Sequence, residues 1–334
     1  MGGSDRVALE PLRLGLIGAG RWGQVLLRSA AALPEIVRIT HISVRNPERL
    51  ASSAPGIAVT DDWKKLIASD CEAVLIAAPD PLHAEMVSAC LAAKKPCWVE
   101  KPLTLDLPST RRLNDAVRKS GLPVWVNHIQ LFNPAYQAVK EAVRKAGGGI
   151  RAIVTEEGDL GPFRRQTDLL WDRLPHDLAL CLDLLSPKAG AVPEPESVRL
   201  LAGMRDGAGR PNMVTLALTF PGRIPVWIQS GRLKGRKQRE LSVFTDQTLF
   251  RFDDQAPVKA SRLQFRYEAP APDSVGPRRE RAGEALSIPS KRTPVQNALE
   301  IFARGVRAGQ TTSPFGTDLA LAIAKILDQC EEKR

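Results

Sequence analysis

Short apolar or β-branched runs alternate with segments of helical spacing along the first third of the chain. The runs lie at 12–17, 35–44, 72–78, 96–100 and 122–127. Between them, apolar residues recur every three or four positions, which predicts helices over 61–70, 81–94 and 108–121. Thr60 is the expected N-cap of the first of these helices. Strands that are apolar almost throughout are typical of a parallel sheet covered by helices on both faces.

The pattern changes after about residue 128. Several segments there alternate apolar and polar residues between turn residues, which predicts an antiparallel sheet. These segments lie at 150–158, 196–204, 212–220, 224–233 and 240–252. Helices are predicted at 133–148, 166–186, 295–308 and 317–332, and an exposed loop at 269–294. We therefore expect an α/β domain over 1–128, an α+β domain over 129–316, and a C-terminal helix, 317–334, that packs back on the first domain.

Length and composition agree with two ordinary globular domains. The chain has 334 residues, of which 43% are apolar and 25% charged. It contains no apolar run of 18 residues and no signal-peptide pattern at its start, so we expect a cytoplasmic protein with no membrane partner. The five cysteines are scattered and form no C-x-x-C pair, which favours reduced thiols and no metal site.

The net charge of +10 raises the question of an anionic partner. Lys and Arg are spread along the whole chain, and no helix-turn-helix or aromatic-interleaved basic tract accompanies them. The densest basic run, 231–239, lies between two apolar stretches, so we expect a solvated hairpin there. The charge therefore favours an anionic small molecule over nucleic acid.

A glycine pattern follows the first predicted strand directly. Gly18, Gly20 and Gly23 form G-x-G-x-x-G between that strand and a helix, which is the context of the dinucleotide-binding fingerprint. The first glycine permits the tight turn, the second lets the backbone approach a pyrophosphate, and the third lets helix and strand pack closely. The helix N-terminus then faces the anion. The non-functional alternative is a glycine-rich connection in an α/β domain that binds no nucleotide.

The end of the second predicted strand bears on the choice of cofactor. An NAD site usually has a carboxylate there for the ribose hydroxyls, but this chain has Val44. Ser43 and Asn46 could hydrogen-bond a 2′-phosphate, and the Arg45 guanidinium could pair with it. The alternative for Arg45 is a solvated loop residue. We favour NADP over NAD.

Three further motifs, "AAPDPLHAEMV", "EKP" and "WDRLPHD", complete a family pattern. With the glycine loop, they make the sequence resemble the Gfo/Idh/MocA oxidoreductases, which include glucose–fructose oxidoreductase and inositol dehydrogenases. The resemblance runs from Leu12 to the C-terminal helices. It implies a Rossmann domain, a doubly wound parallel sheet, followed by an α+β domain with a large, open, mostly antiparallel sheet. It also implies hydride transfer between a nicotinamide and a sugar or polyol carbon, and a homo-oligomer, dimer or tetramer, formed through the broad sheet.

The resemblance also assigns catalytic roles. Lys101 of E-K-P falls beside the reacting hydroxyl, and Asp172 and His176 form the downstream D-x-x-x-H pair, with His176 as general acid/base. These residue types suit the chemistry, because oxidation of an alcohol needs a proton acceptor at the oxygen and imidazole accepts protons near neutral pH. Pro175 fits the first turn of a helix, so His176 is expected near a helix N-terminus, which favours the neutral ring. Asp172 could orient that ring or bind the substrate, and cationic Lys101 would stabilise an alkoxide. Taken singly, each of these residues also has a non-functional interpretation, as a solvated strand end, a helix cap or a surface contact.

The remaining assignments concern the cofactor and the substrate. The full set of expected cofactor-binding residues is Gly18, Gly20, Arg21, Trp22, Gly23, Ser43, Arg45, Asn46, Pro79, His83, Glu100 and Lys101. Candidate substrate residues are His128, Arg164 and Arg173, with Arg165 and Asn127 as weaker candidates. Leu131 stands where many relatives have arginine, so their substrate rules are in doubt here. An anionic sugar would suit the arginines, although a solvated face is the simpler interpretation of them. The alternative functions are a nucleotide-sugar dehydrogenase or reductase and a non-catalytic dinucleotide-binding sensor.

Overall fold

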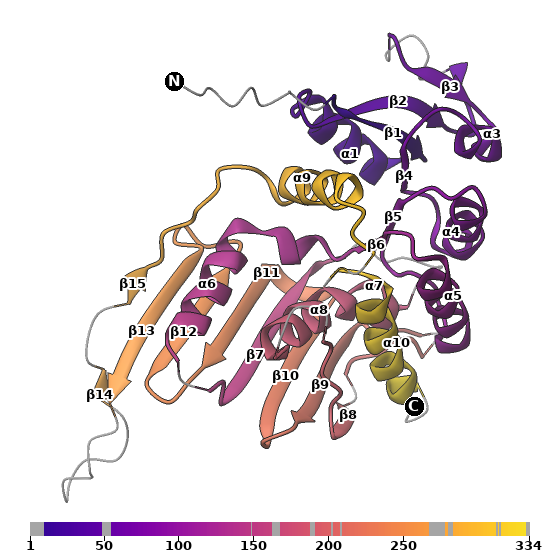
Figure 1. Cartoon of the computed structure of the whole chain (residues 1–334). Helices are drawn as coiled ribbons and strands as arrows, with labels where there is room; N and C mark the ends of the chain where they lie inside the picture. The colour runs from indigo at the N-terminus through magenta and orange to yellow at the C-terminus, as the bar shows by residue number, and fades with distance from the viewer. Residues whose placement is uncertain are drawn as a thin grey trace, which may run out of the picture. The chain divides into compact units, whose positions relative to one another are not determined.

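The computed structural model describes two compact units (Figure 1). The described residues are 10–48, 55–147, 149–161, 168–187, 191–201, 203–207, 209–266, 278–279, 283–311, 313 and 315–331. Those within Met1–Thr104, Arg111–Asn127 and Val295–Thr317 form unit 1. Those within Leu105–Thr110, His128–Pro294 and Asp318–Arg334 form unit 2.

Unit 1 is built on a six-stranded sheet in which every neighbouring pair is parallel, in the order β3-β2-β1-β4-β5-β6. The strands are β1 (Leu12–Ile17), β2 (Val37–Ser43), β3 (Ala58–Thr60), β4 (Ala73–Ile76), β5 (Cys97–Glu100) and β6 (Val124–Asn127). The central strand β4 is buried at all four positions, as its uniformly apolar sequence predicts. The doubly wound parallel sheet expected from the sequence is confirmed.

Helices connect most of these strands, and α9 joins the unit from near the C-terminus. They are α1 (Arg21–Ala31), α3 (Trp63–Ile67), the 3-10 turn η1 (Asp80–Leu82), α4 (His83–Ala92), α5 (Leu107–Ser120) and α9 (Pro294–Arg307). The expected N-cap Thr60 is wrong, because the Asp62 carboxylate accepts the backbone N–H groups of Lys64 and Lys65 at 2.8 and 3.2 Å. A carboxylate placed two residues closer to the helix reaches the free N–H groups more directly.

Helix α9 contributes an aromatic cluster to unit 1. The Phe302 ring lies edge-on to Trp98 of β5 and Trp125 of β6, with ring centroids 5.8 and 5.4 Å apart. Residues 318–331, most of α10 (Thr317–Glu331), group instead with unit 2. Helix α9 thus groups with unit 1 by its contacts, and the packing of 317–334 on the first domain stays a prediction. The domain limits, as units of folding, stay a prediction.

Unit 2 is built on a nine-stranded sheet, which is mostly antiparallel as expected. The order is β14-β13-β12-β11-β7-β10-β9-β8, with β15 beside β13. The strands are β7 (Ala152–Leu160), β8 (Ser197–Leu201), β9 (Met213–Phe220), β10 (Ile224–Gly231), β11 (Leu233–Phe244), β12 (Thr248–Asp253), β13 (Ala260–Arg266), β14 (Arg278–Arg279) and β15 (Glu284–Ala285). Helix α6 packs on β12 and β13, and α8 packs on β7 and β10, in front of the sheet in Figure 1.

The single long helix predicted at 166–186 is two helices in the structure. The helical elements of unit 2 are the 3-10 turn η2 (Ile129–Phe132), α6 (Pro134–Lys145), α7 (Leu169–Asp172), α8 (Leu174–Leu185) and α10. The break falls at Arg173, and Pro175 occupies the first turn of α8 as its fixed φ predicts. Asp172 and His176 therefore belong to different helices, so the helical i, i+4 relation does not apply to them.

The basic run 231–239 is not a solvated hairpin. Strands β10 and β11 are joined by Arg232 alone, yet both pair with β7, which lies between them. Their order in the sheet rules out a hairpin, and three of the basic residues turn inward: Arg232 is 5% exposed, and the side chains of Lys234 and Arg239 are 10% and 12% exposed. Arg236 and Lys237 are exposed, in the irregular part of the β11–β7 pairing.

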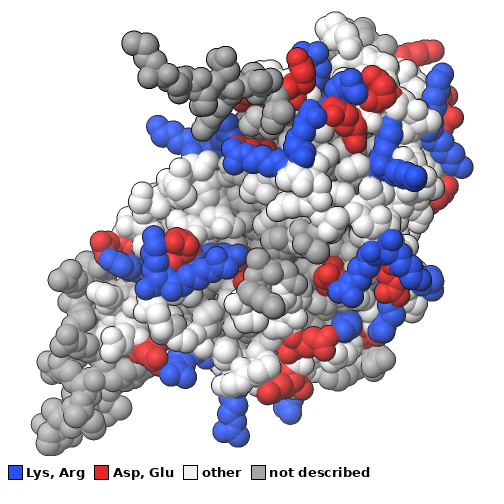
Figure 2. Space-filling model, viewed as in Figure 1, with Lys and Arg blue, Asp and Glu red and all other residues white. Residues whose placement is uncertain are grey.

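The other charges are dispersed. On the face shown in Figure 2, Lys and Arg are scattered over both units, with Asp and Glu among them. That distribution offers no continuous basic stripe on this face, as nucleic-acid binding would favour. In the part of the chain that the structure describes, no helix is long and apolar enough to cross a lipid bilayer.

Candidate functional site

The glycine loop between β1 and α1 has the close approaches that its three glycines predict. Gly18 has φ +91°, and a Cβ there would lie 2.4 Å from the Ala77 carbonyl oxygen. A Cβ on Gly23 would lie 2.0 Å from the carbonyl oxygen of Gly18. Both contacts are shorter than any side chain tolerates, so these two glycines are needed for the turn itself. Around Gly20 a Cβ would meet nothing within 4 Å.

The loop therefore leaves open space at the N-terminus of α1. Gly20 is the N-cap and provides no side chain, and the first turn of α1 has no acidic residue. Free N–H groups at the start of an 11-residue helix, beside an open glycine, suit the pyrophosphate of a dinucleotide. Arg21 is exposed at this point and Trp22 is half-buried. These residues fit the nicotinamide dinucleotide that the fingerprint implies.

The loop after β2 presents a cation where an NAD site usually has a carboxylate. Arg45 and Asn46 are exposed, whereas Ser43 is buried and its carbonyl accepts the Gly18 N–H at 2.8 Å. Ser43 thus connects β2 to the glycine loop through its backbone. The exposed pair is better placed than Ser43 to meet a phosphate group.

The E-K-P motif ends β5. Glu100 is the last residue of the strand, Lys101 follows it half-buried, and the Lys101–Pro102 peptide bond is cis. Across the sheet, Glu100 pairs in register with Asn127 at the end of β6, whose side-chain amide donates to Glu100 Oε1 at 2.7 Å. The structure thus brings Glu100, Lys101 and Asn127 together at the carboxyl edge of the sheet, where ligands of parallel α/β sheets bind.

Glu100 has a strongly perturbed acidity. Desolvation raises its pKa from 4.5 to about 8, although the Asn127 amide, the Lys101 ammonium and the Trp22 indole N–H act in the opposite direction. Some of the residue still reaches solvent. The desolvation of the Glu100 carboxylate therefore raises its pKa by more than Asn127, Lys101 and Trp22 lower it.

His83 ties two loops of unit 1 together. The residue is completely buried, with Nδ1 2.8 Å from the Pro102 carbonyl oxygen and Nε2 3.0 Å from that of Ala78. Pro79, which follows Ala78, is the N-cap of η1. Both ring nitrogens are engaged by backbone, so His83 holds the loop after β4 against the E-K-P loop. Its predicted contact with the nicotinamide, and that of Pro79, stay predictions.

In unit 2, the candidate residues Asp172 and His176 lie on either side of the break between α7 and α8. Asp172 is the last residue of α7 and 8% exposed, and its carboxylate accepts from the Arg232 guanidinium at 3.0 Å. His176 lies in the first turn of α8, half-buried, and its backbone N–H donates to the Arg173 carbonyl oxygen at 3.2 Å. The structure thus gives Asp172 a cationic partner that the sequence did not indicate.

A buried ionic network lies under the start of α8. Glu157 on β7 accepts from Arg173 at 2.5 Å and from Ser230 at 2.7 Å, and lies 3.2 Å from the Arg239 guanidinium. Arg173 also donates to the Gly161 carbonyl oxygen at 2.7 Å. Because its two terminal guanidinium nitrogens hold Glu157 and the Gly161 carbonyl oxygen, Arg173 anchors the point at which α8 begins. It is not on a solvated face, and its role toward a substrate stays a prediction.

Asp177 adds a second perturbed carboxyl to this network. Desolvation raises its pKa from 3.8 to about 7, and the negative charge of Glu157 adds to the rise. Arg239, a Thr155 hydrogen bond and Arg173 partly offset it. The Asp177 side chain is 1% exposed and its Oδ1 lies 3.8 Å from Arg239, beyond hydrogen-bonding distance. The charge pairing is therefore too weak to compensate for burial.

Three other substrate candidates remain: His128, Arg164 and Arg165. His128 is 2% exposed and is the residue from which η2 begins. Its role toward a substrate stays a prediction. Arg164 and Arg165 lie outside the described residues. No cluster of three or more His, Cys, Asp or Glu that could hold a metal ion occurs among the residues that the structure describes.

The sequence interpretation missed Glu157, Asp177, Arg232 and Arg239. A signal was present for Glu157, because it shares the inward face of β7 with Ile153 and Thr155, at alternate positions. A carboxylate on a buried face needs cationic partners. The sequence around Arg232 does not predict its burial. Arg232 is buried because it joins β10 to β11 across the end of β7, which lies between them.

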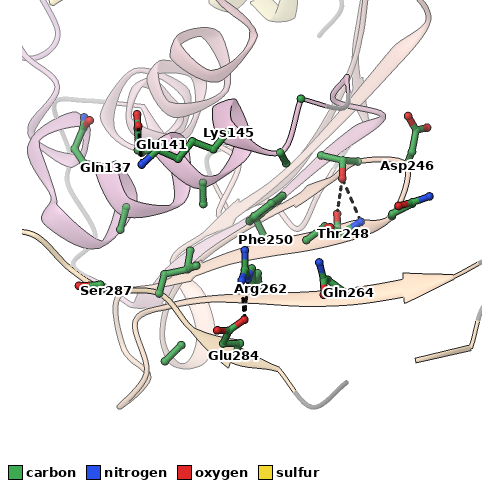
Figure 3. Close-up of a pocket in the computed structure, with 18 of the residues that line it drawn as sticks. Gln137, Glu141, Lys145, Asp246, Thr248, Phe250, Arg262, Gln264, Glu284 and Ser287 are labelled. Atoms are coloured by element: carbon green, nitrogen blue, oxygen red, sulfur yellow. Dashed lines mark hydrogen bonds and ion pairs between the residues drawn. The ribbon is translucent and has the colours of Figure 1, made fainter. Parts of the chain in front are cut away.

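A groove elsewhere in unit 2 is not the candidate site. It has a volume of about 1060 Å³ and lies between α6, β12, β13 and β15 (Figure 3). The side chains of Gln137, Glu141 and Lys145 come from α6, opposite Arg262 of β13, which is paired with Glu284 at 2.9 Å. None of the candidate catalytic or cofactor residues lines it.

Comparison with known proteins agrees with this geometry. Residues 12–128 match the GFO_IDH_MocA model, described as an oxidoreductase family with an NAD-binding Rossmann fold. An oxidoreductase structure from Magnetospirillum magnetotacticum MS-1 is 34% identical with a TM-score of 0.80, over 95% of this chain and 98% of that one. The chain belongs to the Gfo/Idh/MocA oxidoreductase family. An inositol 2-dehydrogenase of Cereibacter sphaeroides is 30% identical over 65% of this chain and 66% of its own length.

More distant solved structures share the fold. A 3-ketoreductase from Actinomadura kijaniata, in complex with TDP-benzene and NADP, is 19% identical with a TM-score of 0.75, over 96% of each chain. The chain spans about half the length of the first curated relatives it matches, among them a myo-inositol dehydrogenase of Streptomyces leeuwenhoekii. Family membership thus establishes the NAD(P)-binding Rossmann domain, with NAD or NADP as its cofactor.

Proposed function

We propose that this protein is an NADP-dependent oxidoreductase that transfers hydride between the nicotinamide and a hydroxyl-bearing carbon of a sugar or polyol. The proposal is supported chiefly by the glycine loop at α1, where the space around Gly20 is open, and by Lys101 at the end of β5 in the same unit. Relatives named inositol 2-dehydrogenase support the substrate class. The dinucleotide, when bound, supplies the hydride acceptor or donor.

In the proposed reaction, the protein's own residues handle the proton and the charge. Neutral His176 accepts the hydroxyl proton during oxidation and returns it during reduction. Lys101 stabilises negative charge that develops on the oxygen. Asp172, whose carboxylate pairs with Arg232 at 3.0 Å, contributes charge and orientation. His128 and Arg173 are the further candidates for substrate contact.

The preference for NADP is proposed from the loop after β2. Exposed Arg45 supports pairing with a 2′-phosphate, and residues 43–47 include no carboxylate that would repel it. Titration of tryptophan fluorescence with NADPH and NADH measures the preference. We expect tighter NADPH binding, and loss of that preference in Arg45→Ala. Tighter NADH binding by the unaltered protein refutes the assignment of Arg45.

Turnover separates an enzyme from a sensor. A panel of sugars, polyols and sugar acids is assayed for NADPH formation with the unaltered protein, Lys101→Ala and His176→Asn. Lys119→Ala, at the exposed end of α5, is the matched control. We expect turnover that Lys119→Ala keeps and the two site variants lose by at least a hundredfold. Cofactor binding without turnover of any panel member favours the sensor.

A nucleotide-linked sugar is the second candidate substrate. The fold similarity to a 3-ketoreductase bound to TDP-benzene supports its inclusion. UDP- and TDP-sugars therefore join the same panel, with their free sugars as controls. A higher kcat/KM for the nucleotide-linked form than for its free sugar would favour this alternative.

We also propose a homo-oligomer formed through the sheet of unit 2. On β10, Trp227 is 44% exposed between buried Val226 and Ile228, so this face of the strand offers an aromatic anchor of the kind enriched at interfaces. Sedimentation velocity measures the mass. We expect a dimer or tetramer that Trp227→Lys weakens, and a monomer at all concentrations refutes the proposal.

A further inference from the structure

Glu157 of β7 is linked to the first turn of α8 at two points. Its carboxylate accepts from the Arg173 guanidinium at 2.5 Å, and the carbonyl oxygen of Arg173, the N-cap residue of α8, accepts the His176 N–H at 3.2 Å. The same carboxylate lies 3.2 Å from the Arg239 guanidinium, which in turn faces the Asp177 carboxyl group at 3.8 Å. His176 therefore lies between two residues, Arg173 and Asp177, that are both linked to Glu157.

The Glu157 side chain is itself held in one place. It is 5% exposed, and the hydroxyl of Ser230 on β10 donates to its Oε2 at 2.7 Å. Arg173 uses its other terminal nitrogen on the Gly161 carbonyl oxygen at 2.7 Å, directly after the end of β7. Hydrogen bonds between a carboxylate and guanidinium groups are among the strongest and most directional in proteins. These contacts therefore hold the start of α8 against β7 and β10.

We propose that Glu157 is a positioning residue that sets the place of the His176 ring by holding the first turn of α8. The inference rests on the proposed function, in which His176 carries the proton. A general base must lie within hydrogen-bonding reach of the hydroxyl, and a displacement of about 1 Å can slow a reaction about a hundredfold. Loss of the Glu157 charge leaves the buried guanidinium groups of Arg173 and Arg239 without their shared carboxylate, which disfavours the present packing of that turn.

A matched control lies at the other end of α8. Asp183, close to the C-terminus of the helix, is 8% exposed and accepts from Lys140 Nζ and from the Tyr136 hydroxyl, each at 2.6 Å. Like Glu157, it is a buried carboxylate with a cationic partner and a hydroxyl partner. We therefore expect Glu157→Gln and Asp183→Asn both to lower the melting temperature, and only Glu157→Gln to displace His176.

Nuclear magnetic resonance of the histidine rings measures the displacement without cofactor or substrate. The chain has four histidines, so protein made with isotope-labelled histidine gives few ring signals, and His176→Asn identifies the signal of His176. We expect this signal to shift or broaden in Glu157→Gln and to stay unchanged in Asp183→Asn. The signals of the other histidines should stay unchanged in both variants, which also shows that the variants are folded. An unchanged His176 signal in Glu157→Gln overturns the inference.

Turnover measures the consequence for the reaction. The probe substrate is the member of the sugar and polyol panel that the unaltered protein turns over fastest. In Glu157→Gln we expect kcat to fall about tenfold to a hundredfold, because the base is displaced, with the KM of the probe within about twofold of its normal value. The Kd of NADPH should stay unchanged, since the glycine loop belongs to unit 1 and Glu157 to unit 2. Asp183→Asn should keep its kcat, and an equal kcat in the two variants overturns the inference.

Ser230→Ala is the second variant, to be used if Glu157→Gln does not fold. It removes one hydrogen bond to Glu157 and leaves the charge in place, so we expect smaller changes of the same kind in kcat and in the His176 signal. If neither quantity changes in Ser230→Ala, the inference is overturned in that case too.

The outcomes separate this inference from the proposed function. Turnover by the unaltered protein together with an unchanged His176 signal in Glu157→Gln overturns the inference alone. Absence of turnover of every panel member by the unaltered protein overturns the proposed function, and the inference with it.

Discussion

Asp177 makes the stability of unit 2 dependent on pH. Its pKa is about 7 in the folded protein against 3.8 in an unfolded chain, chiefly because of desolvation. Between these values the folded protein retains a proton that the unfolded chain has released. The free energy of unfolding therefore falls as the pH rises between these two pKa values. Below the lower value Asp177 does not destabilise the fold, and above the higher value its destabilisation is constant.

The magnitude follows from the size of the shift. Each pKa unit corresponds to about 1.4 kcal/mol, so the rise from 3.8 to about 7 amounts to about 4 kcal/mol when complete. Between pH 5 and pH 8 we expect the unaltered protein to lose about 2 to 3 kcal/mol relative to Asp177→Asn. Asparagine preserves the shape of the side chain and removes the titration, so the difference isolates this one group.

Urea unfolding followed by circular dichroism measures that difference at pH 5, 6, 7 and 8. Asp328→Asn, a partly exposed carboxylate on α10 of the same unit, is the control and should follow the unaltered protein at every pH. If the stabilities of the unaltered protein and Asp177→Asn change in parallel with pH, the account of Asp177 is wrong. A larger loss in Asp177→Asn at high pH would show that its charge is satisfied after all.

Four other substitutions have defined outcomes. Gly20→Ala should leave the melting temperature unchanged but weaken NADPH at least tenfold in fluorescence titration, whereas Gly23→Ala, with its Cβ 2.0 Å from a carbonyl oxygen, should lower the melting temperature itself. Tyr136→Phe should cost about 1–3 kcal/mol in urea unfolding, because its hydroxyl donates to a buried carboxylate at 2.6 Å. Arg232→Met should reduce turnover at least tenfold with unchanged NADPH affinity, since Asp172 loses its partner. Unchanged turnover in that variant would refute a role for the Asp172–Arg232 pair in catalysis.

Unit 1 could be predicted closely because its signals are local. The strands β4 and β5 are apolar runs bounded by turn residues, and α5 ends directly before Gly121, which has φ +64°. The glycine loop follows from the spacing of its three glycines alone. The wrong N-cap, Thr60 in place of Asp62, shows the limit of such signals, since two capping residues lie within reach of the same helix end.

Unit 2 shows why the remainder could not be predicted. The break at Arg173 depends on a partner, Glu157, that comes from a strand of the sheet. The burial of Arg232 depends on Asp172 and on the position of β7 between β10 and β11. Charged residues read singly predict a solvated surface, and only long-range pairing shows which of them turn inward.

The insertion of β7 between β10 and β11 also sets an order of events during synthesis. Residues 224–244 form two consecutive strands, but the middle of the sheet closes only when residues 152–160 lie between them. No local turn nucleates these central pairings, so the chain must close a long loop first, which is slow. We expect the centre of this sheet to assemble after β11 has left the ribosome, while the Rossmann strands β1 to β6 are already available to fold.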